Sequence, residues 1–219
     1  MIGFYNYTVI LTYIGLISTF IGITQVFEGN FMQAMFCLIL SGVCDMFDGV
    51  VARTHKGRSE HAKKFGIQID SLCDVICFGV FPAIINYAFT RMVKPEFSVI
   101  AAIVSSFFVL TAVIRLGFFN VMEEERQKQT NELRKMYQGM PVTTVAGFLP
   151  LLYMFRNRLA AVNIDFYIIL NVFCVALGFL YILNIPVPKA HKRGIIAMSI
   201  IGVVMITVLL LQFFGKISF

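Results

Sequence analysis

Charged side chains are scarce in this sequence. Aspartate, glutamate, lysine and arginine make up 14% of the 219 residues, against roughly 25% in an ordinary soluble domain. Hydrophobic residues make up 58%, and the mean hydropathy is +0.82. This composition excludes an ordinary soluble domain and indicates an integral membrane protein. Because almost every long segment is needed to cross the bilayer, little of the chain is left for a separate soluble domain.

Pairs of residues that bind zinc or form disulfides are also lacking. The five cysteines all lie in apolar runs without a CxxC pair, and no histidine stands at metal-ligand spacing. We therefore expect the cysteines to be small buried hydrophobic side chains, and we do not expect zinc. The segment MIGFYNYT lacks the basic region and cleavage site of a signal peptide, so the first apolar run is predicted to be a retained span.

The basic residues are not gathered in a single patch either, although the formal net charge is +6. The basic residues are spread over the connections between apolar segments, which indicates orientation signals and contacts with lipid headgroups. Nucleic acid is therefore not an expected partner. Twelve of the 18 Lys and Arg residues lie in one set of connections and five in the other. By the positive-inside rule the first set is cytoplasmic, which puts the N-terminus inside and, with seven spans, the C-terminus outside.

Seven apolar segments are predicted to form membrane helices, since about 20 residues cross the hydrocarbon core. The predicted fold class is all-α, a polytopic membrane helix bundle. The fifth segment contains Pro141 and Pro150, so it is expected to be kinked or to end against its neighbours. The seven segments lie near residues 5–27, 31–52, 68–90, 97–121, 140–156, 164–184 and 194–215.

Two of the predicted cytoplasmic segments are rich in charge. The connection 54–65, THKGRSEHAKKF, is basic. It is expected to be a loop that sets the topology, and its cations stand where an anionic substrate would approach. The segment 123–135, EEERQKQTNELRK, mixes acids and bases at helical spacing. This pattern favours a solvated helix over a partner-binding segment.

Four aspartates stand next to or inside apolar runs. Asp45 and Asp48 are three positions apart, and Asp70 and Asp74 are four apart, so each pair shares one face of its helix. The two helices are joined by a short connection and should run antiparallel, which can bring all four carboxylates together. An Asp at the centre of a spanning helix costs about 2.5–3.5 kcal/mol. Such a cluster therefore needs compensation.

Hard divalent cations are the natural compensation, since oxygen ligands suit Mg²⁺, Mn²⁺ or Ca²⁺. Two such ions beside a basic connection would clamp a phosphate or pyrophosphate, which indicates transfer at phosphorus. The small residues Gly49, Ala52 and Gly66 would leave room for a bulky group, although small residues also serve helix packing. Clustered carboxylates also mark ion pathways, so a divalent-cation transporter is the alternative from another class.

Together these residues resemble the signature of the CDP-alcohol phosphatidyltransferase family, DxxDGxxAR followed by GxxxDxxxD. The stretch between the two halves is four residues longer than the usual pattern. Four residues are about one helical turn, so the face that carries the aspartates can be kept. All eight signature positions are filled, by Asp45, Asp48, Gly49, Ala52, Arg53, Gly66, Asp70 and Asp74.

The resemblance implies a CDP-binding site with two divalent cations, Mg²⁺ or Mn²⁺, held by the four aspartates. It also implies that Asp74 is the catalytic base, which takes the proton from the acceptor hydroxyl. Arg53 is implied to contact the pyrophosphate. The residues that the resemblance assigns to the nucleotide are Asp45, Gly49, Ala52, Arg53 and Gly66.

Within the family, the chain is most similar to the phosphatidylserine synthase branch. This likeness implies transfer of a phosphatidyl group from CDP-diacylglycerol to the hydroxyl of L-serine at the cytosolic membrane face, giving phosphatidylserine and CMP. Another acceptor, inositol phosphate or glycerol phosphate, is the alternative. Ser71 and Val75 stand where the phosphatidylglycerophosphate synthase branch usually has Pro and Lys. The likeness is carried by the stretches Arg115–Asn120, Gly139–Pro141 and Pro186–Pro188.

Arg115 stands alone inside an apolar segment. It could snorkel or pair with a carboxylate, or its guanidinium could bind the carboxylate of serine or a phosphate. The match with the synthase pattern favours the second interpretation. Arg115 and the nearby Asn120 are therefore candidate acceptor-binding residues.

The resemblance also implies a domain organisation. It covers about the first 190 residues, so we expect a family domain of six spans over residues 1–190. Residues 191–219 are expected to form an additional spanning helix. A homodimer embedded among membrane lipids is an expectation from the resemblance.

Overall fold

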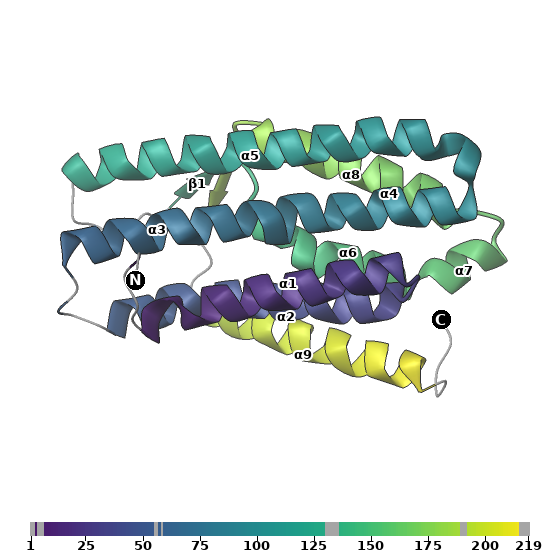
Figure 1. Ribbon diagram of the computed structural model, residues 1–219, viewed down its shortest axis with the longest axis horizontal. Coiled ribbons are helices and arrows are strands. Elements are labelled where there is room, and N and C mark those ends of the chain that lie inside the picture. Colours follow the sequence, from purple (N-terminus) through teal and green to yellow (C-terminus); the bar gives the residue numbers. More distant parts are fainter. Residues whose placement is uncertain are drawn as a thin grey trace.

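The computed structural model describes residues 3, 7–54, 57, 59–129, 136–188 and 192–214. The long helices lie along one common direction, as expected for a bundle (Figure 1). In chain order the elements are the 3₁₀-helix η1 (Tyr7–Val9), α1 (Ile10–Phe27), α2 (Phe31–Thr54), α3 (Glu60–Asp74), the π-helix η2 (Val75–Val80), α4 (Phe81–Val93), the 3₁₀-helix η3 (Pro95–Phe97), α5 (Ser98–Gln129), β1 (Met136–Gln138), the 3₁₀-helix η4 (Val142–Thr144), α6 (Val145–Met154), α7 (Arg156–Ala161), α8 (Phe166–Ile182), β2 (Pro186–Pro188) and α9 (Lys192–Phe213).

The described helices agree with the prediction of a polytopic helical membrane protein. By length and composition, four of them can cross a membrane: Ile10–Phe27, Phe31–Ala52, Glu60–Val93 and Pro95–Arg126. The remaining apolar helices are shorter and cover Val142–Met154, Phe166–Ile182 and Gly202–Gln212. Each of the seven predicted segments thus contains an apolar helix. Over the described residues, only the helices of the first four segments are long and apolar enough to cross a membrane.

Helices α1 and α2 form a closely packed antiparallel pair. Gly29 in the turn between them has a φ of +77°, a left-handed conformation that favours glycine. Hydroxyl groups bond across the pair: Ser18 donates to the Cys37 carbonyl at 3.0 Å, and Ser41 donates to the Gly15 carbonyl at 2.9 Å. Small and hydroxyl side chains allow spanning helices to approach closely, which explains the tight contact.

Helix α3, the π-helix η2 and α4 form one uninterrupted helix from Glu60 to Val93. The prediction of a loop over residues 54–65 is therefore wrong for its second half. Ser59 caps the helix by accepting a hydrogen bond from the Ala62 amide at 3.2 Å, and Glu60 lies in the first turn. Both features stabilise a helix N-terminus, so the helix begins earlier than hydropathy indicates.

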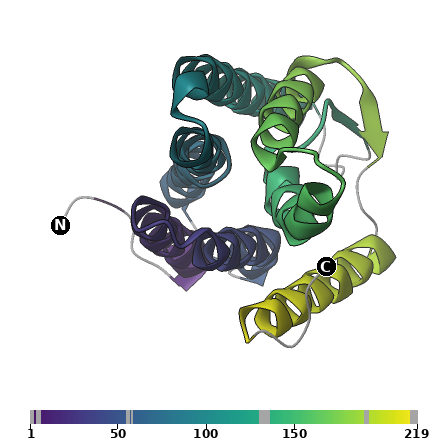
Figure 2. The ribbon, with the colours of Figure 1, turned by 90° about the vertical axis from the view of Figure 1, so that its right-hand side faces the viewer.

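The other helices complete the bundle around the α1–α2 pair. Viewed along the helices, the α3–α4 helix stands beside the pair and α5 lies beyond it, while α8 packs against α5 and α6 packs against α2 (Figure 2). Large aromatic side chains fill the centre, and Phe78, Phe81, Phe108 and Tyr181 are at most 1% exposed. Their burial fixes the distances between the helices that carry the candidate site.

A buried amide network ties α4, α5 and α8 together away from the acidic residues. Asn86 Nδ2 lies 3.1 Å from Ser105 Oγ and 3.2 Å from Asn171 Oδ1. Asn171 in turn donates to Thr90 Oγ1 at 3.0 Å. Polar groups at membrane depth must find partners within the protein, so this network fixes how the three helices pack.

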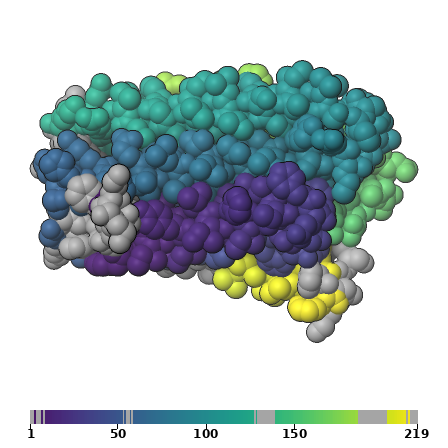
Figure 3. Space-filling view, viewed as in Figure 1, coloured from purple at the N-terminus to yellow at the C-terminus, as the bar shows by residue number. Residues whose placement is uncertain are grey.

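Many large apolar side chains are exposed on the outer surface of the bundle. The face seen in Figure 3 is built by α1, the α3–α4 helix and α5. On α1, Ile14, Ile17, Phe20 and Ile21 are 42–67% exposed. Exposed apolar side chains in such number mark a contact with lipid or another apolar partner, which agrees with a membrane location.

The predicted segment 194–215 is helical over its described part. Helix α9 packs against α2 and α6, and Gln212 Nε2 donates to the Met154 carbonyl at 3.1 Å. Figure 2 shows α9 on the outside of the bundle.

Helix α5 carries the charged segment that was predicted to be helical. It continues to Gln129, with ion pairs Arg126–Glu123 at 2.6 Å and Lys128–Glu124 at 3.1 Å. The helix prediction is confirmed up to this point, and residues 130–135 lie outside the described part of the chain.

Candidate active site

The carboxylates of Asp45, Asp70 and Asp74 lie together. One oxygen of each is within 4.8 Å of the others. Asp48, one turn along α2 from Asp45, is only 8% exposed and lines the same small cavity as Asp45 and Asp74. The structure therefore brings together the four aspartates that the spacing singled out, and we call them the acidic cluster.

The acidic cluster depends on α1 as well as on the two helices that carry it. Helix α1 packs along α2 and also against α3 and η2. Among the described residues, α2 and α3 make few direct contacts with each other. Helix α1 therefore bridges the two aspartate-bearing helices and sets their separation.

The donor set of the acidic cluster suits hard divalent cations. Several carboxylates in a partly buried, apolar setting repel one another unless a counter-charge is present. The two ion pairs found among the described residues are both on α5, between side chains outside the cluster. Oxygen ligands favour Mg²⁺ or Mn²⁺ over zinc, so the residues fit the expected cations.

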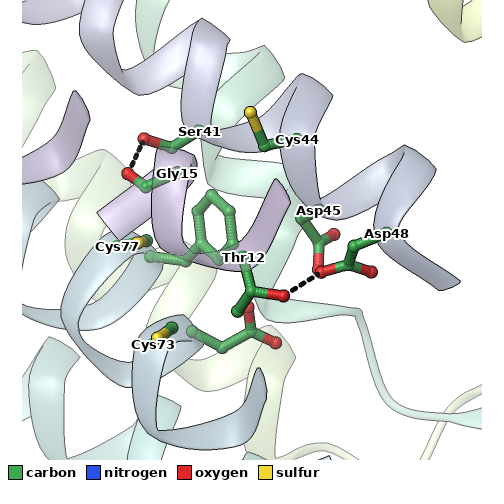
Figure 4. A pocket seen from close by; sticks show the side chains of 10 residues that line it. Thr12, Gly15, Ser41, Cys44, Asp45, Asp48, Cys73 and Cys77 are labelled. Atoms are coloured by element: carbon green, nitrogen blue, oxygen red, sulfur yellow. Dashed lines mark hydrogen bonds between the residues drawn. The ribbon is translucent and has the colours of Figure 1, made fainter. Parts of the chain in front are cut away.

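A small cavity adjoins the acidic cluster (Figure 4). Its volume is about 10 Å³, which is close to the space that one water molecule needs. The cavity itself can therefore hold an ion or a water molecule, and it is too small for a larger ligand. Its lining comes from α1, α2 and the α3–η2 helix, and consists of Thr12, Gly15, Ser41, Cys44, Asp45, Asp48, Cys73, Asp74, Cys77 and Phe78.

The small signature residues share the helix faces that carry the aspartates. Gly49 and Ala52 follow Asp45 on α2 by four and seven positions, and Gly66 precedes Asp70 on α3 by four, spacings that lie on one helical face. All three are half-buried. Arg53 lies in α2, but its side chain is outside the described part of the structure.

The helix changes its winding directly after Asp74. Residues Val75–Val80 form the π-helix η2, in which Cys77, Phe78 and Gly79 are buried. A π-helical turn is wider than an α-helical turn and is frequent at functional sites. It changes the register between the aspartates of α3 and the side chains of α4. Hydrophobic periodicity carries no signal for such a turn, so the sequence did not predict it.

Asn120 lies beside the acidic cluster. Its Nδ2 is 2.8 Å from Ser71 Oγ, and its Oδ1 is 3.2 Å from the same atom. Ser71 directly follows Asp70 on α3. This contact between α5 and α3 places the Asn120 amide next to the aspartate-bearing face.

Arg115 has different partners. It is buried, with Nε 3.2 Å from the Met140 carbonyl oxygen and Nη2 3.4 Å from that of Gly139. Its guanidinium also lies 5.4 Å from the centre of the Phe119 ring. Arg115 and Asn120 are five residues apart, about 140° around a helix, so the two candidate acceptor residues face different neighbours.

A second, larger cavity lies beside Arg115. It has a volume of about 280 Å³. Helix α5 and the end of α8 form its walls, together with the chain that leads to β2. The lining residues are Ile114, Arg115, Phe118, Tyr181, Ile182, Leu183 and Asn184.

The three stretches that carry the branch likeness meet in space. Arg115 bonds to the carbonyls of Gly139 and Met140. Strand β1, just before Gly139, pairs antiparallel with β2, with Gln138 opposite Pro186. The Gly139 amide also donates to the Ile185 carbonyl at 2.8 Å. We call these strands with Gly139 and Met140 the ribbon, which Arg115 fastens to α5.

Several side chains at the site were not singled out by the sequence. Thr12 Oγ1 donates a hydrogen bond of 3.1 Å to Asp48 Oδ2, although α1 carries no signature residue. Cys44, Cys73 and Cys77 line the cavity and are buried, as expected for small hydrophobic side chains. A single threonine in an apolar helix has no distinctive pattern, so only the tertiary structure identifies it.

The fold and the acidic cluster define a helical membrane protein whose carboxylate oxygens suit divalent cations. The family model of CDP-alcohol phosphatidyltransferase matches residues 5–180, and the chain belongs to this family. It is therefore a transferase, and the cation-transporter alternative is not supported.

Curated relatives share most of this length. The CDP-diacylglycerol--serine O-phosphatidyltransferase of Helicobacter pylori is 32% identical over 178 residues, which is 80% of this chain and 70% of the relative. The Saccharomyces cerevisiae protein of the same name is 36% identical over 140 residues, 63% of this chain and 48% of the relative. An archaetidylserine synthase of Methanothermobacter thermautotrophicus is 29% identical over 179 residues, 81% of this chain and 67% of the relative.

Proposed function

We propose that this protein transfers the phosphatidyl group of CDP-diacylglycerol to the hydroxyl of L-serine, giving phosphatidylserine and CMP. The observation that carries the proposal is the acidic cluster, which fills the four acidic positions of the family signature. The choice of serine is supported by the names of the similar proteins. It is also supported by the bond from Arg115 of α5 to the ribbon, which brings the three branch-like stretches together.

Two divalent cations, Mg²⁺ or Mn²⁺, are the proposed cofactors. Asp45, Asp70 and Asp74 would hold them, with Asp48 as the fourth carboxylate. Bound cations at such a site neutralise charge on the oxygens of a reacting phosphate. Without them the same carboxylates would repel the diphosphate of the substrate.

In the proposed reaction Asp74 is the catalytic base. It accepts the proton of the serine hydroxyl while the hydroxyl oxygen forms a bond to the phosphorus that carries diacylglycerol. The bond from this phosphorus to the CMP oxygen breaks, and CMP leaves with the bonding electrons. A base must lie within reach of the proton that it accepts, and Asp74 lines the small cavity at whose edge the substrates would meet.

The remaining signature residues are proposed to bind substrate. Gly49, Ala52 and Gly66 are half-buried beside the aspartates, where the lack of a large side chain leaves room for the nucleotide. Asp45 and Arg53 would complete this part of the site, with Arg53 at the pyrophosphate.

Asn120 and Arg115 are proposed to bind the acceptor. Support comes from the position of Asn120 beside Ser71 and from the cavity next to Arg115. This cavity of about 280 Å³ is large enough for a small polar molecule.

The proposed topology has seven spans, with the active site facing the cytosol, the N-terminus inside and the C-terminus outside. Helix α9, with 22 residues, is about 33 Å long, and α8, with 17, is about 26 Å, against roughly 30 Å of hydrocarbon core. Exposed Lys63 and Lys64 near the start of α3 agree with a cytosolic end.

The proposed organisation divides the chain into two parts. Residues 1–190 would form the family domain of six spans and residues 191–219 an additional spanning helix. The family match ends at residue 180, before α9, which supports this division. A homodimer among membrane lipids remains a proposal from the family resemblance.

An acceptor panel tests the proposed function. Purified protein in detergent is supplied with CDP-diacylglycerol, Mg²⁺ or Mn²⁺, and one acceptor at a time, and CMP release is measured. We expect release with L-serine and little with inositol phosphate or glycerol phosphate. Turnover with another acceptor but not with serine would assign the protein to a different branch of the family.

A further inference from the structure

Helix α1 reaches into the candidate site through one side chain. Thr12 Oγ1 lies 3.1 Å from Asp48 Oδ2 and donates a hydrogen bond to it (Figure 4). Thr12 also lines the small cavity together with Asp45 and Asp74. The family signature lies entirely on α2 and α3, so nothing in it assigns a role to this residue.

The bond joins parts of the site that are otherwise weakly connected. Asp48 belongs to α2, and it lines the same small cavity as Asp74 of α3. Helix α1 packs against both α2 and the α3–η2 helix, while α2 and α3 make few contacts among the described residues. A hydrogen bond from α1 therefore holds Asp48 in a fixed orientation relative to the aspartates of α3.

We propose that Thr12 is a positioning residue for the cation site. Its hydroxyl donates a hydrogen bond to Oδ2 of Asp48, so that the other oxygen, Oδ1, can bind a cation. A carboxylate has about four acceptor positions, so one hydroxyl bond orients the group without using it up. The inference rests on the proposed function, because it deepens the same cation-assisted transfer.

A purely structural role for Thr12 predicts different variant behaviour. Valine has nearly the shape of threonine, so Thr12→Val removes the hydrogen bond and keeps the packing of α1. Serine keeps the hydroxyl and loses the methyl group, so Thr12→Ser keeps the bond and weakens the packing. If the bond matters, the serine variant resembles the wild type, and if the packing matters, the valine variant does.

A matched control is available on the same helix. Thr24 donates to the Ile21 carbonyl of its own helix at 2.7 Å and does not line either cavity. Thr24→Val makes the same chemical change in α1 without touching the acidic cluster, and should leave cation binding and activity unchanged.

Two measurements on the full chain in detergent test the proposal. Mn²⁺ binding without substrate is followed by electron paramagnetic resonance, and CMP release from CDP-diacylglycerol and serine is followed against Mn²⁺ concentration. Loss of a hydrogen-bond partner of a metal ligand typically costs about 10–100-fold in metal affinity. We expect Thr12→Val to raise the half-saturating Mn²⁺ concentration by that factor, and Thr12→Ser to restore it.

The outcomes separate this inference from the proposed function. Wild-type affinity for Mn²⁺ in Thr12→Val, or a serine variant as weak as the valine variant, would overturn the role of Thr12. If the wild type binds Mn²⁺ but releases no CMP with serine, the proposed function fails and the binding measurement still decides on Thr12. If the wild type binds no Mn²⁺, both are overturned.

Discussion

Gly139 offers the sharpest test of how the ribbon is built. It has a φ of +75°, a conformation that costs an L-residue roughly 1–2 kcal/mol. A Cβ atom at this position would lie 3.0 Å from the carbonyl oxygens of both Leu183 and Tyr181, and 3.4 Å from Arg115 Nε. Gly139→Ala therefore adds backbone strain and crowds the contact that fastens the ribbon to α5.

The expected loss of stability follows from these terms. The backbone cost of about 1–2 kcal/mol corresponds to a fall of about 2–8 °C in the unfolding temperature of a chain of this size, and the crowding adds to it. Thermal unfolding of the purified protein in one detergent, followed by circular dichroism, measures the change.

Gly147→Ala is the matched control for Gly139→Ala. Gly147 lies in α6, and its added Cβ would meet nothing within 4 Å. Its unfolding temperature should stay equal or rise slightly, because alanine is the better helix former. If Gly139→Ala proves as stable as Gly147→Ala, the described geometry of the ribbon is wrong.

Two further predictions concern the helix pair and the acidic cluster. Gly22→Ala should lower the unfolding temperature, because the added Cβ would collide with the Phe81 ring and lie 2.8 Å from Cys37 Cβ. We expect this crowding to outweigh the helix preference of alanine, which is about 1 kcal/mol. A stability equal to that of Gly147→Ala would contradict the described packing. Mg²⁺ or Mn²⁺ should raise the unfolding temperature of the wild type, because a cation that binds the folded state stabilises it. Asp70→Asn should reduce that rise, and an undiminished rise would place the cations elsewhere.

The sequence predicted the acidic cluster because local spacing determines it. A separation of three or four positions places two aspartates on one helical face, and a short connection makes the two helices neighbours. The early start of α3 was missed because the cap at Ser59 acts independently of hydropathy. The π-helix η2 was missed because it alters the winding without changing the apolar pattern.

Tertiary contacts account for the rest of what the sequence could not predict. Thr12 bonds to Asp48, 36 positions away in the chain. Gln138 pairs with Pro186 because the helices between them, α6 to α8, return the chain to the same end of the bundle. Arg115 and Asn120 were grouped because they are close in sequence, but their positions on α5 turn them toward different neighbours. No spacing rule captures contacts of this kind.

The protein is proposed to transfer a phosphatidyl group to serine at the acidic cluster, with Asp74 as the base. The most direct measurement is the incorporation of radiolabelled L-serine into chloroform-soluble phosphatidylserine by the purified protein with CDP-diacylglycerol and Mn²⁺, compared between the wild type and Asp74→Asn. We predict labelled lipid with the wild type, and none with an Asp74→Asn variant that inserts and unfolds normally. Labelled lipid at the wild-type rate from Asp74→Asn would contradict the role of Asp74, and its absence from the wild type would contradict the proposed function.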